Sequence, residues 1–188
     1  PGSYPENINF NGKEITVLSQ EGPEQTFIRD SSEELFSLDF ENESDMDFID
    51  YTALYSTPYI SSGYLYFSSN YQDQQTVYIR EINLTNVESA EFSWRHLTNW
   101  AYADRYYFQV SIRSNGGSWD QIYISEYEEN SWQSNNVNLD SYCGTTIEIM
   151  FDNYFRFWGY LWLDDILITG ELNSPNRNSE WINPMVTF

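Results

Sequence analysis

The chain has 188 residues, 29 of them acidic and 8 basic, so its formal net charge at neutral pH is −21. Because such a field repels phosphate groups, the composition excludes nucleic acid and anionic membrane surfaces as expected partners. Aromatic residues make up 19% of the chain, which excludes a disordered acidic tail and indicates a folded domain with a sizeable core. No run approaches the roughly 18 apolar residues that a membrane span needs, so no membrane insertion is expected.

The chain divides into three expected parts. Residues 1–3, Pro-Gly-Ser, are a candidate cloning remnant, and residues 4–172 are expected to form one domain. Residues 173–188 contain two prolines and several asparagines, which predicts a linker or C-terminal tail.

Apolar residues recur with a period of two along most of the domain, which predicts strands with one buried and one wetter face. A single helical turn is expected at Asp30–Leu35, capped by Ser31 or Ser32. The expected strands, in chain order, are Glu14–Leu18, Leu35–Glu41, Tyr64–Ser68, Thr76–Ile82, Ala90–Arg95, Tyr106–Arg113, Gln121–Ser125, Asn136–Leu139, Ile147–Asp152 and Leu161–Thr169. About ten short strands without alternating helices predict an all-β antiparallel sandwich.

One turn is marked clearly in the sequence. Ser114-Asn115-Gly116-Gly117-Ser118 separates two of these strands, and its Asn and Gly residues supply the positive φ angles of a tight hairpin.

The single histidine and the single cysteine limit the catalytic and metal sites that the chain can hold. His96 is the single histidine, at the end of a strand, and no Gly-x-Ser-x-Gly elbow accompanies it, so the residue is interpreted as structural. Cys143 is the single cysteine, which excludes an intrachain disulfide and a cysteine-based zinc site. The chain is therefore expected not to be an enzyme.

Paired carboxylates are the one enzymatic alternative. A β-sandwich can carry a glycosidase whose two carboxyl groups project from one face, and the acidic residues of 39–50 approximate such a cluster loosely. A glycoside-active enzyme therefore stays as the alternative function, beside a structural spacer or assembly domain of a surface protein.

Acidic residues also predict calcium binding at two places. In Asp39-Phe40-Glu41 the aromatic ring is expected to point to the core and both carboxylates to the other face of a strand. Asp164 and Asp165 interrupt an apolar strand, which is costly unless a bulge, a buried cation or a sheet edge relieves it. The metal-free alternative is that both aspartates cap backbone amides at a bulge.

Aromatic residues in loops are the candidate ligand contacts. Most rings are expected to fill the core, but Trp100, Tyr102 and Trp158 lie in predicted loops, where binding residues concentrate. They are the predicted platform for a carbohydrate or a protein ligand.

Four motifs, in order, resemble the jelly-roll domains of the MAM and cleaved-adhesin families. They are Leu38-Asp39-Phe40-Glu41, the hairpin Tyr106–Trp119, the segment Trp132–Gly144, and Gly159-Tyr160-Leu161-Trp162-Leu163-Asp164-Asp165-Ile166. The resemblance implies a concanavalin-like or galactose-binding-like jelly roll holding structural calcium through Glu41, with Asp39, and through Asp164 or Asp165. The chain lacks the paired cysteines of animal MAM domains, which favours a microbial, adhesin-like relative.

The sequence thus predicts a non-catalytic recognition or adhesion module. Its partner is expected to be a carbohydrate or a surface protein, and its location extracellular or on the cell surface, within a larger secreted or surface protein. Calcium is the expected cofactor.

Overall fold

The computed structural model describes residues 32–69, 73–99, 106–125, 129–155 and 159–173. Within these ranges the chain is almost entirely extended. The strands are β1 (Glu33–Leu38), β2 (Ile49–Ala53), β3 (Tyr59–Ser61), β4 (Tyr64–Ser69), β5 (Asp73–Asn83), β6 (Val87–Asn99), β7 (Tyr106–Ser114), β8 (Asp120–Ser125), β9 (Gln133–Asn138), β10 (Thr146–Phe155) and β11 (Gly159–Leu172).

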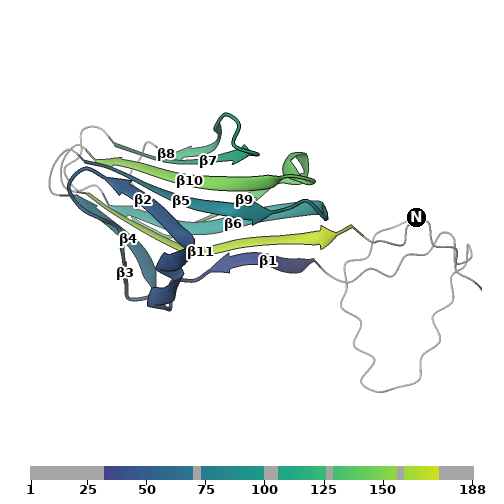
Figure 1. Cartoon of the computed structure of the whole chain (residues 1–188). Coiled ribbons are helices and arrows are strands. Elements are labelled where there is room, and N and C mark those ends of the chain that lie inside the picture. The colour runs from purple at the N-terminus through teal and green to yellow at the C-terminus, as the bar shows by residue number, and fades with distance from the viewer. Residues whose placement is uncertain (1–31, 70–72, 100–105, 126–128, 156–158, 174–188) are drawn as a thin grey trace, which may run out of the picture.

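The strands form two antiparallel sheets that pack face to face (Figure 1). Sheet A has the order β3-β4-β11-β6-β9, and β1 also pairs with β11, so it has six strands. Sheet B has five strands in the order β2-β5-β10-β7-β8. The predicted all-β antiparallel jelly-roll sandwich is confirmed, with eleven strands in the described ranges.

The period of two decides which side chains form the core. On β10, Ile147, Ile149 and Phe151 are fully buried, and the residues between them face outward. Phe92 of β6 meets Phe151 across the two sheets with ring centroids 6.3 Å apart. Burying aromatic and branched side chains of this kind contributes about 1.5–3 kcal/mol each relative to exposure.

The predicted hairpin between β7 and β8 is also confirmed. Asn115 and Gly116 have φ angles of 49° and 72°, and the Gly117 amide donates to the Ser114 carbonyl at 2.9 Å. Two successive positive φ angles match the right-handed twist of the strands they join.

The N-terminal expectations need correction. The helical turn expected at Asp30–Leu35 is wrong from Glu33 onward, because β1 begins there; the described helical turns are the 3₁₀ segments Glu43–Phe48 and Asp140–Tyr142. The short strands β2 and β3 were not expected. The strand expected at Glu14–Leu18 lies outside the described residues.

The opening strand also ends earlier than expected. β1 stops at Leu38, and Phe40 takes a φ of 54° that turns its ring into the core. Asp39 and Glu41 therefore do not share one face of a strand, although Phe40 is buried as predicted.

Helices of the length and apolarity that a bilayer requires do not occur in the described ranges.

Candidate functional site

The outer face of sheet B is polar and aromatic rather than uniformly charged. Alternation on β5, β7 and β10 places one set of side chains in the core and the other set on this face. The outward set is Gln74, Thr76, Tyr78, Arg80, Tyr107, Gln109, Ser111, Arg113, Glu148, Met150, Asp152 and Tyr154.

A carboxylate organises one end of this face. Asp152 is only 8% exposed although it points outward, and three neighbouring side chains contact it. Thr76 donates its hydroxyl at 2.7 Å, Tyr107 donates its hydroxyl at 2.8 Å, and the Gln74 amide lies 3.1 Å from both carboxylate oxygens. We call Gln74, Thr76, Tyr107 and Asp152 the Asp152 floor. Hydrogen bonds to an ionised acceptor are among the strong ones, so these groups are fixed before any ligand arrives.

Two tyrosine rings lie beside the Asp152 floor. Tyr107 of β7 is directly opposite Tyr154 of β10, and their ring centroids are 5.8 Å apart with planes within 18° of each other. Burial, followed by the hydrogen bond to Asp152, raises the pKa of Tyr107, so its hydroxyl keeps its proton at every working pH. This end of the face combines flat apolar ring surfaces with oriented polar groups.

The other end of the face is closed by ion pairs. Arg113 forms two hydrogen bonds with Glu148, at 2.9 and 2.8 Å, and its guanidinium lies 4.5 Å from the centroid of the Trp119 ring. Arg80 pairs with Asp50 at 2.5 Å. These charges are matched within the described residues, so this end adds no net charge to the face.

A buried carboxylate anchors the loop that borders the Asp152 floor. Asp73 is fully buried and accepts the backbone amides of Leu54, Tyr55 and Ser56 at 3.2–3.3 Å. Ala53 pairs with Gln75 across β2 and β5, which brings Leu54 to the level of Gln74. The loop presents Leu54 and Tyr55, which are 71% and 72% exposed, on a fixed backbone.

The outer face of sheet A carries rings that pack mainly on one another. Tyr66 contacts Tyr59, Tyr160 and Trp162 with ring centroids 5.2–5.9 Å apart. Burial raises the pKa of Tyr66 to about 12, with smaller contributions from Tyr160 and Tyr59. Tyr66 stacks on Tyr160 much as Tyr107 stacks on Tyr154, so what distinguishes the outer face of sheet B is the fixed polar floor beside its rings.

The predicted calcium ligands of β11 are held by an arginine. Arg95 lies 2.6 Å from a carboxylate oxygen of Asp164 and 2.6 Å from one of Asp165. The pairing register with β6 shifts between Asp164 and Leu167, and Asp165 has a φ of 47°, so a bulge relieves the polar interruption of this strand. Burial raises the pKa of Asp164 in spite of the Arg95 hydrogen bond, and Asp164 also accepts the amide of Asp165. The bulge expected as one explanation is confirmed, and Arg95 is its unexpected partner.

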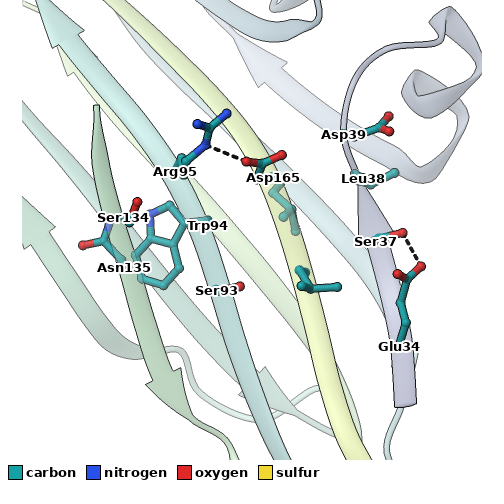
Figure 2. Close-up of a pocket in the computed structure, with 12 residues that line it drawn as sticks. Glu34, Ser37, Leu38, Asp39, Ser93, Trp94, Arg95, Ser134, Asn135 and Asp165 are labelled. Carbon is teal, nitrogen blue, oxygen red and sulfur yellow. Dashed lines mark hydrogen bonds and ion pairs between the residues drawn. The ribbon is translucent and has the colours of Figure 1, made fainter. Parts of the chain in front are cut away.

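Beside this pair lies an open hollow of about 440 Å³ on sheet A. Figure 2 shows Arg95 reaching from β6 towards Asp165 on β11, with Ser37 bonded to Glu34 on β1. Asp39 and Asp165 both line the hollow. Glu41 instead packs on Gly63, whose Cβ, if present, would lie 2.8 Å from Glu41 Oε1.

The four predicted calcium ligands therefore do not converge as a set. In the part of the chain that the structure describes, no three His, Cys, Asp or Glu side chains are grouped so as to hold a metal ion. Asp164 and Asp165 already have a cationic partner, so this arrangement does not fit a calcium site built from them. Calcium binding stays a prediction.

The predicted ligand platform cannot be placed. Trp100, Tyr102 and Trp158 lie outside the described residues.

The interpretation of His96 as structural fits its surroundings. It is fully buried between the sheets, with Nε2 at 2.6 Å from Glu129 and Nδ1 at 3.0 Å from the Asn135 amide. A neutral imidazole protonated on Nε2 satisfies both contacts.

Sequence reasoning missed Asp152 and its ring neighbours as a candidate site. Tyr107 and Tyr154 were among the rings that were expected to fill the core. The alternation along their strands could have found them. Each ring lies at an outward position of a strand whose alternate residues are apolar, which indicates a ring on the outer face of the sheet.

No protein-family model matches this chain, and no curated protein matches it. The solved structures that share its fold include the following two. The carbohydrate-binding module TmCBM27, studied for specific mannan recognition, is 12% identical with a TM-score of 0.51, over 76% of this chain and 99% of that one. The K3 cleaved adhesin domain of Lys-gingipain from Porphyromonas gingivalis is 15% identical with a TM-score of 0.51, over 73% and 99%.

These likenesses concern the fold. The cleaved-adhesin half of the expected resemblance has a structural counterpart in the K3 domain. At such low identity, function has to be argued from the site itself.

Proposed function

We propose that this chain is a non-catalytic carbohydrate-binding module and that it binds glycan on the outer face of sheet B. The observation that carries the proposal is the Tyr107–Tyr154 ring pair beside the Asp152 floor. Sugar rings present flat apolar faces bordered by hydroxyl groups, and this end of the sheet offers flat rings bordered by fixed hydrogen-bonding groups.

The fold comparisons support the same conclusion. TmCBM27 is a carbohydrate-binding module and K3 is one domain of a larger adhesin-bearing protein. We therefore propose that this module also belongs to a larger extracellular or surface protein. The net charge of −21 favours neutral over anionic partners.

The test is binding to a panel of soluble polysaccharides by affinity electrophoresis, followed by isothermal titration calorimetry with the best oligosaccharide. Tyr107→Ala and Tyr154→Ala are each expected to weaken binding about tenfold, which corresponds to roughly 1.4 kcal/mol. Trp162→Ala, on the outer face of sheet A, is the matched control and is expected to bind as the wild type does. Equal loss in the control, or none in either tyrosine variant, would refute this site.

Catalysis is tested on the same panel. A reducing-sugar assay is expected to detect no product, since Asp50 is paired with Arg80 and Asp39 Oδ1 accepts the Glu41 amide at 3.1 Å. Release of sugar, abolished by Asp39→Asn, would establish the glycosidase alternative instead.

Protein recognition is the second candidate function, favoured by the exposed pair Leu54 and Tyr55 on the loop fixed by Asp73. Exposed apolar groups on a fixed backbone are typical of interaction surfaces. No binding to any glycan, together with a protein partner lost in Leu54→Ser, would favour this function.

A further inference from the structure

Asp152 fixes the direction of every hydrogen bond in its floor. An ionised carboxylate can only accept, so Thr76, Tyr107 and Gln74 must all donate to it. This assignment needs no observed hydrogen, because the chemistry of the acceptor leaves one orientation for the Gln74 amide.

The donors that point inward leave acceptors facing outward. One N–H of Gln74 is used on Asp152, and the amide nitrogen also lies 3.3 Å from the Tyr107 hydroxyl, which takes the second N–H. The Tyr107 proton is used on Asp152. What these two residues still offer to a ligand is therefore the Gln74 carbonyl oxygen and a lone pair of the Tyr107 oxygen.

The charge of the floor acts in the same direction. Among the described residues that contact Asp152, all donors are neutral, so its negative charge stays uncompensated there. At the other end of the face, Arg80 and Arg113 are matched by Asp50 and Glu148.

Resting on the proposed function, we propose that the ligand contacts the Asp152 floor only through donors, and that Asp152 is the positioning residue that sets this polarity. The module accordingly takes neutral glycans and protonated amino glycans, and it discriminates against uronate and sulfated glycans. A carboxylate or sulfate at this position would face acceptors and a buried negative charge, with no donor to pair with it.

The test compares glycans that share a backbone and differ in one group. Calorimetric titrations at 150 mM NaCl would use hexasaccharides of β-1,4-glucan, β-1,4-glucosamine and β-1,4-glucuronan, and the β-1,4-mannan and mannuronan pair. The neutral member is expected to bind at least tenfold more tightly than its uronate, and the amino member at least as tightly as the neutral one. Equal or tighter binding of a uronate would overturn the inference while leaving the proposed function standing, whereas no binding by any glycan of the wider panel would overturn the proposed function itself.

The variant Asp152→Asn distinguishes a positioning role of Asp152 from a purely structural role. The new amide is a donor, so Tyr107 or Gln74 must turn to accept from it, and a donor becomes available to the ligand. The neutral-to-uronate ratio is expected to fall at least fivefold. Glu91→Gln, which removes the same charge from the exposed side of β6 in sheet A and leaves both the floor and the Arg80–Asp50 pair intact, is expected to keep the ratio of the wild type.

A purely structural role gives a different pattern, since a distorted floor would weaken neutral and uronate ligands alike and leave their ratio unchanged. Tyr107→Phe provides the second variant if Asp152→Asn does not fold. It removes one outward acceptor and keeps the ring, so binding of the neutral hexasaccharide is expected to weaken about threefold to tenfold. Unchanged binding in this variant would contradict the proposal.

Discussion

Single residues on this sandwich are fixed by partners that are distant in the sequence. His96 illustrates this, because its two ring nitrogens meet Glu129 and Asn135 from a different part of the chain. Burial lowers the pKa of His96, and it outweighs the opposing effect of Glu129. The sequence placed His96 at a strand end but could not supply these partners, which lie 33 and 39 residues away.

The lowered pKa predicts the pH dependence of stability. An unfolded histidine titrates near 6.5, so the unfolded chain takes up a proton before the folded one does as the pH falls. The stabilisation is therefore complete above about pH 6.5 and is lost as the pH falls towards the folded-state pKa, with a slope of at most about 1.4 kcal/mol per pH unit.

Because His96 is the single histidine, its imidazole signal in NMR is unambiguous. We expect that signal to titrate below pH 6.5, and we expect His96→Gln to show a smaller change in unfolding free energy between pH 7.5 and 5.5 than the wild type. A titration above 6.5 would contradict the expectation.

At the scale of elements, the bulge in β11 shifts the register in which this strand pairs with β6. Asp164 pairs with Arg95 and Leu167 with Ser93, so three steps on β11 match two on β6. The extra residue lets Leu163 and Ile166 both face the core although they are three positions apart. Without it, the period of two would turn the second half of β11 inside out.

Removal of the extra residue is therefore expected to be severe. Deleting Asp165 should turn Ile166 and Ile168 to solvent at a cost of about 3–6 kcal/mol, a large share of the 5–15 kcal/mol typical of a domain. Asp165→Gly keeps the residue count and relieves the positive φ, so it should lie within about 1 kcal/mol of the wild type. Urea denaturation followed by circular dichroism measures both; similar midpoints for the two variants would show that the register is not set here.

The strands themselves could be predicted because alternation is a local property. β5, β7 and β10 lie where the pattern places them, and the interrupted pattern at Asp164–Asp165 correctly offered a bulge as one solution. The partner of Asp164 could not be predicted from the sequence in the same way. Arg95 and Asp164 are 69 residues apart, and their contact depends on which strands become neighbours, which alternation alone does not specify.

For the whole molecule, charge is the dominant long-range property. With a net charge of −21, the folded chain repels itself, and screening by salt should stabilise it. This general effect must be separated from any specific binding of calcium.

Raising NaCl from 20 to 500 mM is expected to raise the Tm in a thermal melt. Millimolar calcium at constant ionic strength isolates specific binding, since only a further increase reversed by EDTA would support the calcium prediction. A Tm that falls or stays constant with NaCl would show that self-repulsion does not limit stability.

The pairing of the start of β1 with the end of β11 has a mechanical consequence. Glu33, where β1 begins, is opposite Gly170, two residues before β11 ends, so the described part of the sandwich begins and ends at the same end of one ladder (Figure 1). A tensile load applied through the flanking polypeptide would open the β1–β11 ladder like a zipper, one rung after another, instead of shearing all its rungs together. Because its rungs would break singly, this ladder is expected to open at a lower force than a ladder of the same length loaded in shear.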